Sequence, residues 1–522
     1  MHLYIVNMLV WIDKLFLKLI IVLVFLLGSY VVAAQEIGFF GVYTDSQEIS
    51  LKPTDIVETS AGDFLILANE IGGYRSKILK IDPDGVIEDE IVLSVQDSTL
   101  KLNNLILVQD ATFESECYMA IGSSQGSDYG RSFVTIWVDI DLNILKRVVE
   151  PFDFPKYPYI SKRFIRLNNS VISAFYIFDG QGHKDHFLVR LSEEGRVVNY
   201  KRCDADSLLM MSNIFPIHGE QNKIGMFAIT SNESSAMSGV HVFDSVFSRE
   251  RSVYFPKWHT IEDSVLFLDF IEAHESMMAP ISGNNYVMSS QFKGCSIQIF
   301  DGQVISYNKS VILAKLDNNF QVMHDSVVIG HYNDSTELPA THRSVVVTAD
   351  SCMYQVSLGN VNTEYPYIRD LHLIVTKTDM DLNVLWQKRY LREDTPYFTF
   401  TSTATDDGGL VVIGHNYDYN INHRYDLFVM KINPEGMLDA DEITIIDDVV
   451  VYPNPGNCVL NISTAMPNAS VEVYDALGRL VHQQKLIDNV TTIDTRDWMV
   501  GIYVWKVIAN DKEVETGKWI KN

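Results

Sequence analysis

The stretch FTFTSTATDDGGLVVIGHNYDYNINHRYDLFVMKINPEG, residues 398–436, is the clearest copy of a unit that recurs along most of the chain. Thr399 to Gly414 predicts two short strands on either side of the turn run DDGG, because Asp and Gly tolerate the backbone of a tight turn. A polar, aromatic-rich loop follows from Asn416 to Tyr425, and a third strand then ends at the turn NPEG. The unit is therefore strand, turn, strand, loop, strand, turn.

The end of this third strand, at Asn433, has six counterparts upstream at a mean spacing of about 58 residues. These counterparts are Asp82, Asp139, Ser192, Asp244, Asp317 and Asp379. Periods of this length with several strands per unit are typical of propeller blades. The sequence predicts an all-β chain with a seven-bladed β-propeller, six or eight blades being the alternatives, and a strand at 37–43 that completes the last blade.

Composition narrows the function classes. The 522 residues include 41 Lys and Arg against 67 Asp and Glu, a formal net charge of −26, so the chain would repel nucleic acid. The five cysteines, Cys117, Cys203, Cys295, Cys352 and Cys458, form no CxxC or Cys/His cluster, so neither a zinc site nor a disulfide-dense scaffold is predicted. We expect no metal and no cofactor.

The N-terminus predicts a signal peptide at 1–34. Lys14 and Lys18 precede the apolar run 19–27, and small residues lead to a cleavage site between Ala34 and Gln35. A retained membrane anchor is the alternative, but the apolar part is shorter than the ~20 residues of a spanning helix. We therefore expect no stable transmembrane segment after processing.

The loops between the second and third strands are the long ones, and they share one face of a propeller with the connections between blades. Tyr and Arg among Gly, Ser and Asn are typical of binding loops. The candidate ligand-binding residues are Tyr74, Arg75, Tyr129, Arg131, His183, His186, Tyr365, Tyr367, Arg369, Tyr417, Tyr419, His423, Arg424 and Tyr425. The alternative is that these side chains only pack over the blade ends. The longest insertion, 291–310, predicts an elongated hairpin that could determine specificity.

Motifs for catalysis or metal binding are weak. The segment GSSQG at 122–126 matches a nucleophile elbow but lacks the helix that must follow, so we interpret it as a loop. The segment HKDH at 183–186 lacks the helix of an HExxH site. Pairs such as Asp82 and Asp84 recur at hairpin turns and do not supply the oxygens of a calcium loop. No catalytic residue is predicted.

After an acidic linker at 439–448, residues 449–522 predict a small Ig-like β-sandwich with alternating strands. Four ordered segments, YPNP, VYDALGR, GIY and KWIK, resemble the type A C-terminal sorting domain of the Bacteroidetes type IX secretion system. The residues that carry the resemblance are Tyr452, Pro453, Asn454, Pro455, Tyr474, Asp475, Gly478, Arg479, Gly501, Tyr503, Lys518 and Lys521. The repeats at 35–438 likewise resemble the degenerate propeller repeats of secreted proteins from this bacterial group.

The resemblance implies a route and two partners. It implies transit of the periplasm, recognition by an outer-membrane translocon, removal by a sortase-like peptidase, and a secreted or surface-attached location. For the propeller itself we expect a binding protein for an extracellular protein or glycan. The alternative is a hydrolase or lyase acting on polysaccharide or peptide, and a catalytic group of carboxylates at the propeller centre would distinguish the two.

Overall fold

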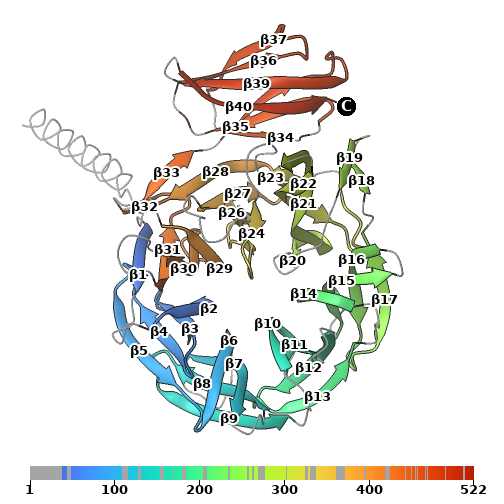
Figure 1. Ribbon diagram of the computed structural model, residues 1–522. Coiled ribbons are helices and arrows are strands. Elements are labelled where there is room, and N and C mark those ends of the chain that lie inside the picture. Colours follow the sequence, from blue (N-terminus) through green and yellow to red (C-terminus); the bar gives the residue numbers. More distant parts are fainter. Residues whose placement is uncertain are drawn as a thin grey trace, which may run out of the picture.

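A computed structural model of the chain shows a ring of β-sheets joined to a small β-sandwich (Figure 1). It describes residues 38–521 except 44–48, 109–115, 127–130, 153–157, 168–169, 179–183, 204–207, 221, 233–234, 256–257, 262–263, 268–276, 301–302, 324–326, 330–336, 360–370, 393–394, 418–423, 441–442, 448, 453, 455, 465, 467, 488–489 and 510–511. The predicted signal peptide and its Ala34/Gln35 cleavage site lie outside the described residues. Among the described helices none has the length and apolar character to cross a membrane.

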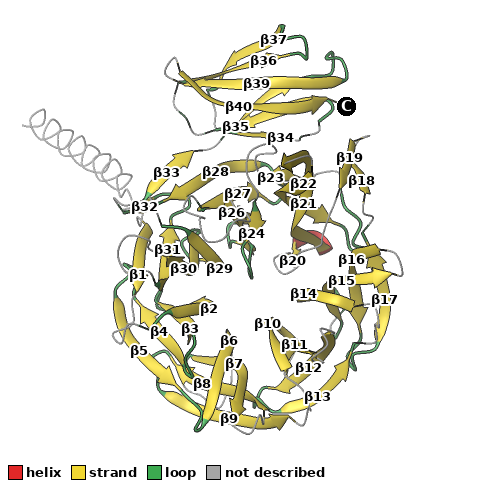
Figure 2. Ribbon diagram, viewed as in Figure 1, coloured by secondary structure: helices red, strands yellow, loops and turns green. Residues whose placement is uncertain are grey.

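Seven sheets form the ring, and the predicted seven-bladed propeller is confirmed (Figure 2). Blades 1 to 4 each have four antiparallel strands, numbered outward from the ring axis. Their bounds are β2 (Leu51–Glu58), β3 (Phe64–Glu70), β4 (Ser76–Ile81) and β5 (Ile87–Leu93); β6 (Ser98–Val108), β7 (Cys117–Gly126), β8 (Arg131–Asp139) and β9 (Ile144–Phe152); β10 (Pro158–Leu167), β11 (Ser170–Phe178), β12 (Lys184–Ser192) and β13 (Val197–Arg202); and β14 (Leu208–Pro216), β15 (Ile224–Asn232), β16 (Ser235–Phe243) and β17 (Arg249–Tyr254).

Blades 5 to 7 carry additional short strands. Blade 5 contains β18 (Trp258–Ile261), β19 (Ser264–Phe267), β20 (Met277–Ile281), β21 (Asn285–Phe300), β22 (Gln303–Leu316) and β23 (Val327–Ile329), with a short 3-10 turn at Ser282–Asn284. Blade 6 contains β24 (Leu338–Pro339), β25 (Val345–Val347), β26 (Cys352–Gly359), β27 (His372–Asp379), β28 (Val384–Leu391) and β33 (Thr444–Asp447). Blade 7 contains β29 (Tyr397–Ala404), β30 (Leu410–Tyr417), β31 (Tyr425–Ile432), β1 (Gly38–Tyr43) and β32 (Leu438–Asp439).

The N-terminal strand closes the ring, as the sequence predicts. β1 pairs antiparallel with β31, Phe40 opposite Met430, and so becomes the fourth strand of blade 7, with the two-residue β32 paired to its outer edge. The hydroxyl of Tyr43 donates a hydrogen bond to the Gly85 carbonyl of blade 1 at 2.6 Å. The first strand therefore connects the last blade to the first.

Each blade ends its third strand in the same turn. In all seven, the side-chain oxygen of the residue at that strand end accepts at least one backbone N–H of its own turn. In blade 1 the donors are Asp84 and Val86, at 3.0 and 2.7 Å from Oδ1 of Asp82. The acceptors in the other blades are Asp139, Ser192, Asp244, Asp317, Asp379 and Asn433. This confirms the predicted register and the interpretation of the recurrent Asp residues as turn residues.

The third residue after each acceptor has a positive φ, and the space beside that residue is filled in one of two ways. Where it is glycine, an aromatic ring of the preceding blade fills the space: a Cβ on Gly85 would lie 2.5 Å from Phe39, and Trp137 and Trp386 occupy the same place over Gly195 and Gly436. Where it is not glycine, its own side chain is buried between the blades. Those residues are Leu142, Phe247, Phe320 and Leu382.

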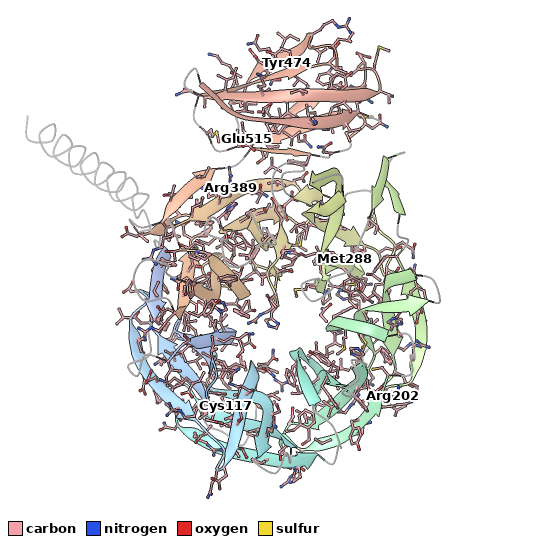
Figure 3. The ribbon with its side chains drawn as sticks, viewed as in Figure 1. Cys117, Arg202, Met288, Arg389, Tyr474 and Glu515 are labelled. Carbon is pink, nitrogen blue, oxygen red and sulfur yellow. The ribbon has the colours of Figure 1, made fainter. Side chains whose placement is uncertain are left out.

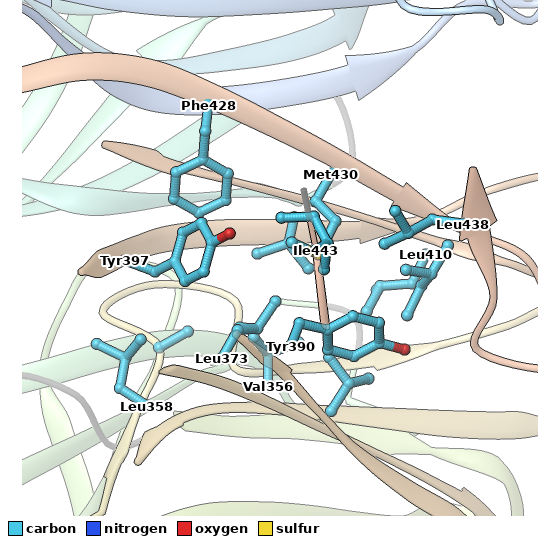
Figure 4. Packing of buried hydrophobic residues seen from close by; sticks show 14 of the residues in the cluster. Val356, Leu358, Leu373, Tyr390, Tyr397, Leu410, Phe428, Met430, Leu438 and Ile443 are labelled. Atoms are coloured by element: carbon cyan, nitrogen blue, oxygen red, sulfur yellow. The ribbon is translucent and has the colours of Figure 1, made fainter. Parts of the chain in front are cut away.

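The core consists of apolar layers between neighbouring blades. Between blades 6 and 7, for example, Tyr390 and Leu373 pack against Phe428 and Met430 (Figure 4). Buried side chains occupy the spaces between the other sheets in the same way, Met288 of blade 5 facing blade 4 (Figure 3). Stability is therefore distributed around the ring and depends on each blade having two neighbours.

The C-terminal sandwich consists of two sheets over one core. One sheet contains β34 (Val450–Tyr452), β35 (Val459–Ser463) and β38 (Val490–Asp494), and the other contains β36 (Ala469–Tyr474), β37 (Leu480–Lys485), β39 (Gly501–Ala509) and β40 (Lys512–Lys521). Val450 and Tyr452 pack on blades 5 and 6, against residues that include Leu313 and Val384. β33, within the segment expected to be a linker, pairs with β28 as an outer strand of blade 6.

Candidate functional site

The candidate site is the end of the ring that carries the loops between second and third strands and the connections between blades. We call it the long-loop face. The strands run further toward this face than the sequence predicts, because polar residues such as those of GSSQG at 122–126 continue the pairing of β7 with β8. Ser124 is buried within that sheet, so the interpretation of this segment as a loop is wrong. The 291–310 insertion is a long hairpin, as expected, since β21 pairs with β22 as far as Phe300 and Gln303.

Seven of the fourteen candidate residues are described. Tyr74, Arg75, Tyr417, Arg424 and Tyr425 lie on the long-loop face, Tyr417 and Tyr425 as partners at the ends of β30 and β31. Arg131 begins β8, and its side chain is not described. Those outside the described residues are Tyr129, His183, Tyr365, Tyr367, Arg369, Tyr419 and His423.

His186 does not fit the prediction that the candidate residues are exposed on the long-loop face. It lies within β12 opposite Tyr176, its side chain is only 3% exposed, and its ring packs 5.8 Å from that of Tyr176. The HKDH segment therefore does not expose this histidine on the long-loop face.

A depression of about 550 Å³ opens on the long-loop face between blades 1 and 2. Tyr74 and Arg75 form one side. The rest of the lining comes from the connection between the blades and the end of β7, and consists of Ser94, Val95, Asp97, Ser98, Thr99, Gln125 and Gly126. Hydroxyl, amide and carboxylate groups beside an exposed ring can bind a sugar or a peptide, since they offer both donors and acceptors.

The Tyr74 side of this depression is held in place by the neighbouring blade. Lys101 donates to the carbonyls of Glu70 at 2.6 Å and Gly73 at 3.2 Å, and the Leu100 N–H donates to the Tyr74 carbonyl at 2.9 Å. Arg75 pairs with Glu70 at 2.7 Å. The Tyr74 side chain itself is 69% exposed, so an anchored loop presents a free aromatic ring.

Beside this loop is a second group of residues, which we call the Lys52 cluster: Lys52 on β2, Phe398 and Phe400 on β29, His415 on β30 and Tyr425 on β31. The Lys52 ammonium lies 4.8 Å from the centroid of the Phe400 ring. The His415 ring lies 5.0 Å from Phe400 and 4.6 Å from Tyr425. All five residues are near the ends of their strands on the long-loop face.

Burial governs the charges of the cluster. Burial lowers the pKa of the Lys52 ammonium. Burial, with a smaller effect of Lys52, lowers the pKa of His415 to about 3, so His415 is neutral at physiological pH. A cation over an aromatic ring gains about 0.5 to 2 kcal/mol, which is less than the several kcal/mol that removing an ammonium from water costs.

Nearer the ring axis, Asp55 is a structural carboxylate. It is paired with Arg343 of blade 6 and accepts from the Leu105 N–H of blade 2 at 2.9 Å. Arg343 also donates to Thr401 of blade 7 at 3.1 Å. Burial raises the pKa of Asp55 and Arg343 opposes that shift. These contacts join four blades, so we assign Asp55 to the closure of the ring.

The motif residues of the sandwich also have structural contacts. The side-chain amide of Asn454 donates to the Lys518 carbonyl at 2.8 Å and accepts from the Ile520 N–H at 3.0 Å, both on β40. Asp475 accepts a backbone N–H of its own turn and pairs with Arg479. Tyr503 is buried beside Trp519, and Lys521 donates to Asn457 at 2.9 Å. Gly478 and Gly501 have positive φ, Lys518 is exposed on β40, and Pro453 and Pro455 lie outside the described residues.

Comparison with known proteins identifies this part of the chain. Residues 450–522 match the family described as the secretion system C-terminal sorting domain. The predicted sorting domain is confirmed. It implies recognition by the type IX secretion machinery and export to the cell surface or secretion. No curated protein matches the sequence.

Solved structures resemble the whole chain only distantly. PorZ of Porphyromonas gingivalis, described as an essential bacterial surface component of the type-IX secretion system, has 10% identity, with 92% of this chain and 82% of that chain covered and a TM-score of 0.20. The WD40 domain of SCAP from fission yeast has 8% identity, coverage of 76% and 98%, and a TM-score of 0.33. A PL25 ulvan lyase has 9% identity, coverage of 66% and 87%, and a TM-score of 0.38.

Proposed function

We propose that this protein is an exported binding protein that holds an extracellular glycan or protein ligand on the long-loop face of its propeller. The observation that carries the proposal is the depression between blades 1 and 2, where Tyr74 stands exposed on a loop anchored by Lys101. An anchored aromatic side chain loses little conformational entropy when a ligand binds. No specific observation among the described residues favours the hydrolase or lyase alternative.

The sandwich serves the export step in this proposal. Large apolar side chains are exposed at the end of the sheet where β37 and β39 begin and β40 ends: Leu477, Leu480, Met499, Val500, Ile502 and Ile520. Exposed apolar groups gathered at one place are typical of protein contacts. We assign this end of the sandwich to the outer-membrane translocon, and the predicted linker 439–448 to the sortase-like peptidase that separates cargo from sandwich.

The test of the binding function is a glycan and protein array probed with the purified protein and two variants. Tyr74→Ala removes the exposed ring, and Val86→Ala is the matched control, since Val86 is 61% exposed on the opposite face of the same blade. We expect the strongest array signals to fall at least about tenfold for Tyr74→Ala and to persist for Val86→Ala, because loss of one central aromatic contact costs 2 kcal/mol or more. Equal signals for all three proteins would refute the proposal.

A further inference from the structure

Lys52 differs from other lysines that the ring buries in part. Lys77 pairs with Glu90 at 3.3 Å, Lys315 with Asp381 at 3.0 Å and Lys431 with Asp407 at 3.2 Å. Within the residues that the structure describes, Lys52 has no carboxylate partner, and its contact is with the Phe400 ring. A partly buried ammonium with only a ring for a partner has unused capacity for an anion.

A second polar group beside Lys52, on His415, also lacks a hydrogen-bond partner among the described residues. The Nδ1 atom of His415 is buried and makes no hydrogen bond to any described residue, and the His415 ring rests on the same Phe400 ring as Lys52. The neutral imidazole has one donor and one acceptor nitrogen. Other buried polar atoms of the described residues also lack a partner, and His415 differs from them in sharing the Phe400 ring with Lys52.

We propose that the Lys52 cluster binds the carboxylate or sulfate of an acidic sugar, with the anion on Lys52 and the sugar ring against Tyr425. This inference rests on the proposed function, because the cluster belongs to the long-loop face, and it names the chemical class of the ligand. A single anion supplies the partner that Lys52 lacks. The aromatic side chains of the cluster can pack against a sugar ring, and the neighbouring depression offers hydroxyl and amide groups to sugar hydroxyls.

The net charge of −26 limits which acidic ligands fit. A long polyanion would be repelled by the chain as a whole, whereas one anion held at Lys52 is a local interaction. At 0.15 M salt the screening length is about 8 Å, so the distant carboxylates contribute little to binding at the cluster. The expected ligand is therefore a glycan with isolated acidic residues.

Isothermal titration calorimetry on the full-length protein at 0.15 M salt tests this inference. The probes are a trisaccharide with one glucuronate, the methyl ester of that trisaccharide, a trisaccharide of neutral sugars that carries one sulfate group, and an acetylated peptide with one glutamate. The variants are Lys52→Gln, Lys52→Arg and, as matched control, Lys146→Gln, since Lys146 also lies over a ring, 4.7 Å from the centroid of Trp137, but on an outer strand. Thermal unfolding of each variant checks that it is folded.

We expect the wild type to bind the glucuronate or the sulfate probe at least about tenfold more tightly than the methyl ester, as a charge-assisted contact provides. Lys52→Gln should lose that preference, while Lys52→Arg and Lys146→Gln should keep it. Equal binding of acid and ester, an unchanged preference in Lys52→Gln, no binding of either acidic probe, or equally tight binding of the peptide would each overturn the inference. If array ligands still depend on Tyr74 in that event, the binding function stands and only the ligand class is wrong.

Discussion

Glycines in the recurrent turn show how single residues set the spacing of the blades. Gly85 and Gly62 have the same φ of 88°, but only Gly85 has the Phe39 ring where a Cβ would lie. Gly62 has its nearest such atom at 3.7 Å, on Pro83. The two positions therefore separate the need for a left-handed backbone from the need for space.

We predict that Gly85→Ala destabilises the protein more than Gly62→Ala. Both variants should lose about 1 to 2 kcal/mol from the left-handed backbone, and Gly85→Ala about 1 to 3 kcal/mol more from the clash with Phe39. The measurement is the urea midpoint of each variant. Equal midpoints would show that Phe39 moves aside freely.

Buried histidines should make the stability depend on pH. His241 on β16 bonds to Ser252 at 2.7 Å, and burial, with a smaller effect of Arg249, lowers its pKa to about 4. The unfolded chain binds a proton near pH 6.5 and the folded chain does not, so the stability contributed by neutral His241 is present above pH 6.5 and is lost as the pH falls toward 4.

We predict that the melting temperature of the wild type falls between pH 7 and pH 4.5 and that His241→Gln falls less over the same range. Glu58 has the opposite effect on the pH dependence of stability, because burial raises its pKa to about 7. The stability that protonated Glu58 contributes is therefore lost as the pH rises from 4.5 to 7. A Glu58→Gln variant should therefore lose stability more steeply on acidification. Parallel curves for wild type and His241→Gln would contradict the assignment.

Lys52 and His415 show what the sequence does not reveal at this scale. The loops were expected to carry the site because of their Tyr and Arg content, and that reasoning located Tyr74, Arg75 and Tyr425. Lys52 and His415 lie in strands of different blades, and only the closure of the ring brings β2 beside β29 and β30. The one sequence feature that could have indicated the Lys52 cluster was a lysine within the alternating segment 51–58.

At the scale of elements, the repeat register was predictable because the turn chemistry is local. The Asp or Asn that accepts its own turn's N–H groups can be read from the sequence in six blades, with Ser192 in the other. Phe247 occupies the position that is glycine in the turn NPEG, because a residue in the left-handed region can also serve there when its side chain fills the space between blades. That compensation involves a neighbouring blade and is invisible in one repeat.

The role of β1 in closing the ring can be tested by deletion. Deleting Gly38–Tyr43 should lower the melting temperature by many degrees, because it leaves β31 as an unpaired edge and removes the buried Phe39 and the Tyr43 bond to blade 1. The milder Tyr43→Phe should cost about 1 kcal/mol. Tyr390→Phe is its matched control, since Tyr390 donates to Gly436 in the same way at 2.8 Å.

The outcome that would contradict this role for β1 is a deletion variant that melts with the wild type. In that case the ring would be closed by packing between blades 7 and 1 alone. Similar losses for Tyr43→Phe and Tyr390→Phe would show that the same hydrogen bond stabilises both junctions.

At the scale of the whole molecule, the chain combines a ring with an export domain that rests on blades 5 and 6 through Val450 and Tyr452. We predict that Ile502→Glu, at the exposed apolar end of the sandwich, lowers the fraction of protein outside the cell several-fold. Ile487→Glu is the control, because Ile487 is 87% exposed beyond the other end of β37. The measurement is the ratio of extracellular to periplasmic protein, and equal ratios would exclude this end of the sandwich as the recognition surface.

Hydrogen–deuterium exchange of the protein, with and without its strongest array ligand, tests whether the ligand binds on the long-loop face. We predict slower exchange at 74–75, 94–99 and 125–126, the segments that contain the lining residues of the depression. The turns at 82–86 and 140–143, on the opposite face, should exchange at unchanged rates. Protection of those turns, with none at the depression, would show that the ligand binds on the opposite face of the ring.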